Sequence, residues 1–154
     1  MITPTEVLTR ILKAPTDIEN VRSLVTDDVI YVSLNYDNPE LKRVMPWAGT
    51  SRGPEAIVRT FVDVARYWKA QAFEIEALLE FGESAAMFGR FTYKSNVLSK
   101  SVTSPFAILA RVTSGRCTYL HSWRIRSRPG PLSAAAEAGT SRAIRMVKRL
   151  QFEL

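Results

Sequence analysis

Four consecutive segments with strand character follow residue 72, and this clustering constrains the fold more than any other feature of the sequence. Apolar side chains alternate with polar ones, mostly glutamates, between Phe73 and Phe81, which is the period of a half-buried strand. Three more β-rich segments follow, at 85–94, 101–112 and 116–125. Short turns, the first at Gly82, separate all four. Because tight turns join antiparallel neighbours, we expect an antiparallel meander.

Helical periodicity comes before the meander. Apolar residues recur at helical spacing in three segments, at 4–14, at 18–25 after Thr16 or Asp17 as a cap, and from Pro54 to about Trp68. Between the last two lie a short β-rich run, Val29 to Leu34, and a polar loop at 35–54. This order predicts an α+β domain in which three helices cover a curved antiparallel sheet. Such a cone encloses an apolar cavity, the natural place for a ligand.

Length and composition indicate one soluble domain. The chain has 154 residues, 46% hydrophobic and 23% charged, and no apolar run approaches the roughly 20 residues that span a bilayer. Cys117 is the single cysteine and cannot form an internal disulfide. Met1 is followed by Thr3, Pro4 and Glu6 rather than by a basic and then an apolar stretch, so we expect a cytoplasmic protein.

The net charge of +6 is concentrated in one part of the chain. Residues 1–121 carry 14 Lys and Arg against 13 Asp and Glu, whereas residues 122–154 carry 7 against 2. We therefore expect a nearly neutral domain at 1–125 and a basic tail at 126–154, with a short helix near 144–150. The tail is expected to pack on protein, with no specific nucleic acid and no membrane as partner.

Several strings resemble the nuclear transport factor 2 superfamily, and within it the SnoaL-like and ketosteroid-isomerase-like proteins. The resemblance spans about residues 5–120 and is carried by 24–32 (LVTDDVIYV), 46–61 (PWAGTSRGPEAIVRTF), 88–93 (FGRFTY) and 115–120 (GRCTYL). It implies the cone fold and, as in many proteins of this kind, a homodimer formed through the meander. A fold of this type hosts many activities, so the resemblance does not imply one reaction.

The ketosteroid isomerase residues can be compared position by position. That family uses a carboxylate base, a tyrosine and a protonated carboxylic acid. The resemblance puts Ser33 at the base position, Thr9 or its aliphatic neighbours at the tyrosine position, and Ala107 near the second acid. Steroid isomerisation by that mechanism is therefore not expected.

His121 is the single histidine and the one side chain with near-neutral titration, which suits a catalytic base. Strand alternation places Tyr119, His121 and Trp123 on one face. The alternative interpretation is a half-buried histidine packed between aromatic rings.

Aromatic residues could line a pocket for a flat organic molecule, because they offer a large contact area and an orienting phenol. The candidate ligand-binding residues are Tyr31, Trp47, Tyr67, Tyr93 and the strand arginine Arg90. The alternatives are plain core residues and an arginine at a sheet edge. No spaced set of metal ligands is present, so no metal or cofactor is expected, and Cys117 reads as a small buried hydrophobe.

The tail departs abruptly from the resemblance at His121. Similar chains continue there with Gln-Phe-Met-Glu-Asp-Thr-Phe-Ala-Thr, and loss of one base from the first codon converts that string into His121-Ser122-Trp123-Arg124-Ile125-Arg126-Ser127-Arg128. One hypothesis is therefore that the segment is read out of its ancestral frame, which removes two acids of the last strand. The other is a lineage-specific extension.

Two functions follow from these features. The first is a SnoaL-like domain that binds a small, mostly apolar molecule and acts as a metal-independent isomerase, cyclase or dehydratase. The second is a non-catalytic dimeric interaction or ligand-binding module whose activity has been lost with the altered C-terminus.

Overall fold

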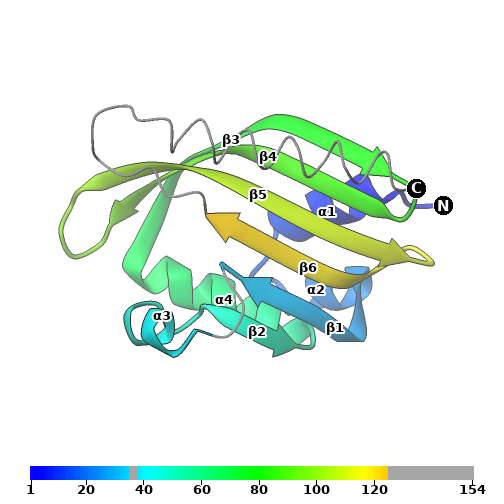
Figure 1. Cartoon of the computed structure of the whole chain (residues 1–154), viewed down its shortest axis with the longest axis horizontal. Coiled ribbons are helices and arrows are strands. Elements are labelled where there is room, and N and C mark those ends of the chain that lie inside the picture. Colours follow the sequence, from blue (N-terminus) through cyan, green and yellow to red (C-terminus); the bar gives the residue numbers. More distant parts are fainter. Residues whose placement is uncertain (35–37, 125–154) are drawn as a thin grey trace. The chain divides into compact units, whose positions relative to one another are not determined.

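The computed structural model describes residues 1–34 and 38–124, and in these residues helices and strands follow the order shown in Figure 1. The helices are α1 (Pro4–Lys13), α2 (Ile18–Leu24), α3 (Pro39–Val44) and α4 (Pro54–Tyr67). The strands are β1 (Val25–Ser33), β2 (Gly49–Arg52), β3 (Trp68–Phe81), β4 (Ser84–Ser95), β5 (Ser101–Thr113) and β6 (Arg116–Arg124). None of the described helices is long and apolar enough to cross a bilayer. The tail helix predicted near 144–150 lies outside the described residues.

The strands form a single sheet in the order β2-β1-β6-β5-β4-β3. The predicted meander is confirmed, because β3 to β6 pair antiparallel in sequence order. The sheet is mixed rather than wholly antiparallel, because β1 runs parallel to β6, with Tyr31 beside Leu120. Parallel neighbours need a long connection between them, and here that connection contains α4 and the first three strands of the meander.

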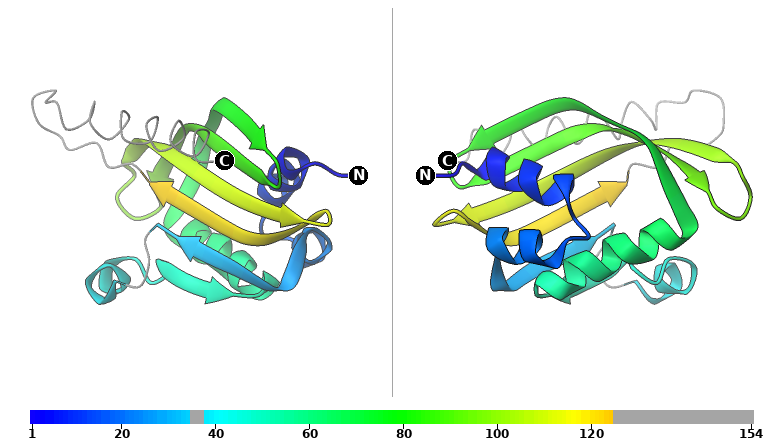
Figure 2. Two further views of the ribbon diagram at one scale, coloured as in Figure 1. Left: turned by 45° about the vertical axis from the view of Figure 1, so that its right-hand side comes forward. Right: turned by 180° about the vertical axis from the view of Figure 1, so that it is seen from behind.

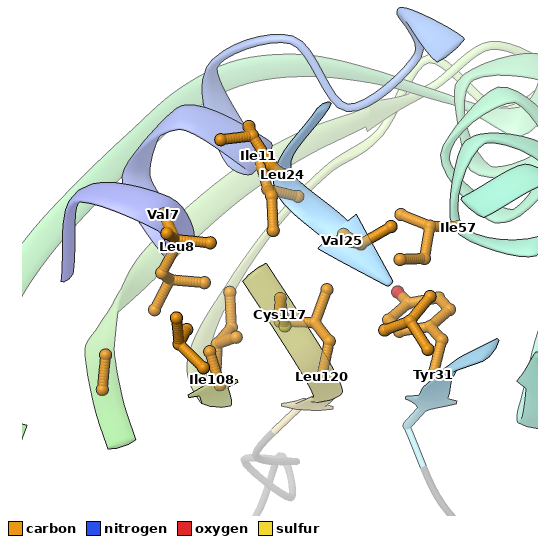
Figure 3. Packing of buried hydrophobic residues seen from close by; sticks show 14 of the residues in the cluster. Val7, Leu8, Ile11, Leu24, Val25, Tyr31, Ile57, Ile108, Cys117 and Leu120 are labelled. Atoms are coloured by element: carbon orange, nitrogen blue, oxygen red, sulfur yellow. The ribbon is translucent and has the colours of Figure 1, made fainter. Parts of the chain in front are cut away.

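Helices α1, α2 and α4 lie against the same face of the sheet, as the view from behind in Figure 2 shows. Thr3 caps α1 in a reciprocal capping box with Glu6, and the Asp17 carboxylate accepts hydrogen bonds from two backbone N–H groups at the start of α2. Figure 3 shows side chains of α1 and α2 meeting those of β1, β5 and β6, among them Leu8, Ile11 and Leu120. The predicted three-helix cover is therefore present and contributes six of the seventeen buried residues of the core cluster.

The segment predicted as a loop at 35–54 contains two further elements. Asn38 caps α3 through its side-chain oxygen, and Pro39 occupies the first helical turn. After α3, β2 pairs antiparallel with β1, with Ser51 beside Tyr31. Both elements are short, six and four residues, so neither has enough periodicity to be recognised in the sequence.

Strand β3 is more exposed than its alternating pattern predicts. It forms one edge of the sheet, and its large apolar side chains are 41–56% exposed at Phe73, Ile75, Leu78, Leu79 and Phe81. Register shifts between Ala70 and Ala72 and between Ile75 and Ala77 break the strict alternation. Close by, a Cβ at Gly89 would lie 2.0 Å from the Glu74 carbonyl oxygen, so β4 requires glycine there.

Candidate ligand cavity

A partly open cavity of about 140 Å³ lies among the sheet, α4 and the segment before β2. Most of its lining is apolar and aromatic, contributed by α1, α4, the loops around α3 and strands β3 to β6. These residues are Leu12, Leu34, Met45, Trp47, Phe61, Val64, Trp68, Phe73, Phe91, Val102, Phe106, Ile108 and Trp123. Stacked rings, such as Phe73 on Phe106 with centroids 4.7 Å apart, give the walls flat surfaces.

A cluster of hydroxyl groups forms the polar part of the wall between β1 and β6. The Tyr31 phenol lies 3.4 Å from the Ser122 hydroxyl, and Ser33 lines the same part of the wall. Burial raises the pKa of Tyr31, and the hydrogen bonds with Ser122 and Ser33 offset part of that rise. Tyr31 therefore remains protonated near neutral pH and keeps an O–H group that can donate a hydrogen bond.

Among the described residues of the lining, the charged side chain is Arg124 at the end of β6. Its Nε donates to the Ser104 hydroxyl at 3.3 Å, and its guanidinium carbon lies 5.7 Å from the centroid of the Phe91 ring. Ser104 is buried and its own hydroxyl is bonded to the Pro105 carbonyl. Two neighbours therefore hold the cation against an aromatic wall of the cavity.

The six residues predicted from the sequence fall into two groups. Tyr31, Trp47 and Tyr93 line the cavity, and burial raises the pKa of Tyr93. Tyr67 is half exposed and does not line it, but its ring lies 5.6 Å from that of Trp47. Arg90 is also outside the lining. It is exposed and its Nε donates to Glu76 at 2.7 Å. It does not stand at a sheet edge, because β4 pairs with β3 on one side and with β5 on the other.

His121 is buried but does not line the cavity. Its ring stacks on Trp123 with centroids 3.5 Å apart, and its Nδ1 lies 3.0 Å from the Tyr119 hydroxyl. Burial lowers the pKa of His121 from 6.5 to about 4, so the imidazole is neutral at physiological pH. The alternative interpretation was a half-buried histidine packed between aromatic rings, and the structure has the rings on both sides but a fully buried imidazole.

Metal-ligand chemistry was not expected, and the described residues hold no cluster of three or more His, Cys, Asp or Glu side chains. Cys117 is fully buried in the core, which confirms its interpretation as a small hydrophobe. Burial raises the pKa of the Cys117 thiol to about 11, so it stays protonated.

Ser122, Trp123 and Arg124 of β6 are among the lining residues that sequence reasoning missed. The alternation that places Tyr119, His121 and Trp123 on one face of β6 places Leu120, Ser122 and Arg124 on the other. That signal was present in the sequence. The sequence does not show which face of β6 points into the cavity. One face carries aromatic residues and the other carries an apolar residue with polar ones, so neither is recognisable as the inner face.

A curved mixed sheet with helices on its inner face and an apolar cavity between them is the α+β cone of the nuclear transport factor 2-like fold, which this chain has. Solved structures with this fold align over most of its length. One is an NTF2-like protein from Burkholderia thailandensis, with a TM-score of 0.67, 21% identity, and coverage of 81% of this chain and 92% of that one. Another is TerC co-crystallised with polyporic acid, with a TM-score of 0.63, 19% identity, and coverage of 80% and 92%.

Two curated fungal proteins are similar in sequence. Patulin synthesis protein F of Aspergillus clavatus is 39% identical over 109 residues, which cover 70% of this chain and 55% of that protein. Patulin biosynthesis cluster protein F of Penicillium expansum is 37% identical over 125 residues, which cover 79% of this chain and 63% of that protein. The chain thus spans little more than half the length of these relatives. No family model matches it.

Proposed function

We propose that this domain binds a small, mostly apolar organic molecule in the cavity and catalyses its isomerisation, cyclisation or dehydration without a metal. The observation that carries the proposal is an aromatic cavity with the Tyr31 and Ser122 hydroxyls set into its wall. The similarity to two proteins of patulin synthesis and the polyporic acid held by a protein of the same fold support it.

The polar groups of the cavity define what chemistry it would support. Tyr31 is a protonated phenol, and Arg124 is a permanent cation. Both would stabilise negative charge on an oxygen atom of the ligand. Tyr31 would polarise a carbonyl group, and the aromatic walls would exclude water.

Intrinsic fluorescence offers a direct binding assay, because Trp47, Trp68 and Trp123, all the tryptophans of the chain, line the cavity. We expect flat aromatic or polyketide-like compounds to change their emission. Tyr31→Phe should weaken binding of carbonyl-bearing compounds about fivefold or more, the effect of one buried hydrogen bond. The matched control is Tyr67→Phe, at a half-exposed tyrosine outside the lining. A screen without any binder, or equal effects of both variants, would contradict the proposal.

A second candidate, a dimeric interaction module, is favoured by the exposed apolar side chains of β3. Edge strands are usually short, charged or covered, whereas β3 is 14 residues long and exposes Phe73, Ile75 and Phe81. The proposed partner is a second copy of the chain. Light scattering after size exclusion tests it. A dimer that Phe81→Ser dissociates is expected, and a clean monomer at about 50 μM would exclude a standard interface.

A further inference from the structure

We propose that the tip of the β4–β5 hairpin, residues 95–100, docks on an anionic lipid membrane. Two aliphatic side chains of the tip would enter the lipid surface, and the lysines beside them would contact lipid phosphates. Figures 1 and 2 show this hairpin at the same end of the domain as α3 and the carboxyl end of α4. The surface belongs to the described domain and not to the basic tail, for which no membrane partner was expected. The inference does not rest on the proposed function.

The two aliphatic side chains project from a tip whose backbone is hydrogen-bonded internally. Val97 is 79% exposed and Leu98 is 69% exposed. The N–H groups of both donate to the Ser95 hydroxyl, at 3.3 and 3.1 Å, and the Ser99 N–H donates to the Ser95 carbonyl at 3.0 Å. Because these donors are satisfied within the turn, the tip can leave water for an apolar layer without exposing unpaired N–H groups.

The tip is also fixed to the end of α4. The Asn96 N–H donates to the Tyr67 carbonyl at 2.9 Å. The Asn96 side-chain amide donates to the carbonyls of Arg66 and Ala65, at 2.9 and 3.3 Å. These carbonyls belong to the last turn of the helix, where backbone acceptors lack helical partners. One residue therefore completes α4 and holds the hairpin in place, which reduces the entropy that the tip loses on docking.

Three lysines concentrate positive charge at the base of this tip. Lys94 and Lys100 flank it in the sequence, and Lys69 lies directly opposite Lys94 in the β3–β4 register. No Asp or Glu occurs at 64–73 or 91–105, and none of the three lysines forms an ion pair with another described residue. Like charges directly opposite each other destabilise a sheet. An anionic lipid surface would offset this repulsion and attract each lysine.

The combination of aliphatic and basic side chains favours a membrane over a nucleic acid. Aliphatic groups gain free energy when they leave water for lipid, whereas binding of single-stranded nucleic acid relies on aromatic rings that stack on bases. Lysine stems can lie along an apolar layer with the ammonium group at the level of the phosphates. Helix α3, at the same end, adds Val44, which is 75% exposed, and the exposed Arg43. Two separate contacts of this kind fit a broad, flat partner.

A polarity-sensitive fluorophore on the tip tests the inference in the full chain. Leu98→Cys is labelled with NBD, and Cys117 is fully buried, so the folded protein takes one label. Vesicles of phosphatidylcholine with about one third phosphatidylserine should shift the emission to the blue and increase it. Vesicles of phosphatidylcholine alone should change it little. The matched control is Phe81→Cys, at an exposed apolar residue of the far end of β3, which should not respond to either vesicle.

A charge variant tests the lysines separately. Lys94→Gln combined with Lys100→Gln should weaken binding to the anionic vesicles about tenfold or more. Arg111→Gln combined with Arg116→Gln removes two exposed charges next to the β5–β6 turn, and should change the affinity less than about twofold. Equal losses in the two double variants would contradict a contact made by the tip.

The outcomes that overturn the inference are distinct from those that concern the cavity. No blue shift of the label on Leu98→Cys with anionic vesicles, or equal shifts on Leu98→Cys and Phe81→Cys, would overturn it. A response to heparin without a response to vesicles would also overturn it, because the partner would then be a soluble polyanion. If Leu98→Cys does not fold, Val97→Cys carries the label instead.

Discussion

Acidification should destabilise the protein through one side chain, His121. Its pKa is about 4 in the folded protein and returns to about 6.5 when the chain unfolds. A histidine with a lowered pKa contributes stability that is present above pH 6.5 and is lost as the pH falls toward 4. Linkage then gives a loss of about 2 kcal/mol between pH 7 and pH 5, and about 3 kcal/mol by pH 4.

Urea unfolding at pH 7 and pH 5 measures this loss, with His121→Gln as the comparison. Glutamine cannot titrate, so the variant should lack the histidine part of the pH dependence whatever its stability at pH 7. The pKa values of Glu6, Glu55 and Glu80 are lowered by hydrogen bonds, and these carboxylates titrate equally in both proteins. Since the chain has one histidine, its single imidazole NMR signal reports the pKa directly. A pKa near 6.5, or equal pH dependence of the two proteins, would refute the reasoning.

Three further predictions concern packing and caps. Gly89→Ala should cost about 2 kcal/mol or more, because its Cβ would meet the Glu74 carbonyl, whereas Gly82→Ala, in open space at positive φ, should cost about 1 kcal/mol in the same thermal melts. Cys117, buried and with a raised pKa, should resist a thiol reagent at pH 8 until urea unfolds the chain, and rapid labelling of the native protein would contradict its burial. Asp17→Ala should lower stability by about 1 kcal/mol through loss of the α2 cap, and an unchanged melting temperature would argue against that cap.

The long elements were predictable because their periodicity is dictated by burial. The helices at 4–14 and 54–68 and the four strands of the meander follow the predicted segments to within a few residues, except that β3 begins five residues earlier, at Trp68. Helix α3 and strand β2 were missed, although Asn38 and Pro39 are a cap and first-turn pair that could have marked α3. The exposure of β3 was also missed, because alternation identifies two faces without saying whether anything covers either of them.

The candidate site was predictable only in its aromatic part. Tyr31 and Tyr93 line the cavity because a curved sheet turns large side chains of its inner face toward the helices, and Trp47 lines it from the segment before β2. Arg90 and His121 attracted attention for their chemistry, yet one pairs with Glu76 and the other stacks on Trp123. The arginine that lines the cavity is Arg124 rather than Arg90. Whether Arg90, His121 and Arg124 line the cavity depends on which face of each strand points inward. That direction is a property of the assembled sheet.

The parallel pairing of β1 with β6 has a consequence for how the chain is made. Val25 and Tyr31 meet Cys117 and Leu120, partners that follow about 90 residues later in the sequence. Closing so long a loop carries a large entropic cost before any contact repays it, and sheets with such distant partners fold slowly. During synthesis, β1 is surrounded by α1 and α2 and has β2 as its neighbouring strand until β6 leaves the ribosome. Its apolar residues Val25 and Val29 therefore lack the contacts that β6 provides for most of translation. We therefore expect nascent chains that end before residue 116 to bind chaperones and resist folding, even though they already contain α1, α2 and α4.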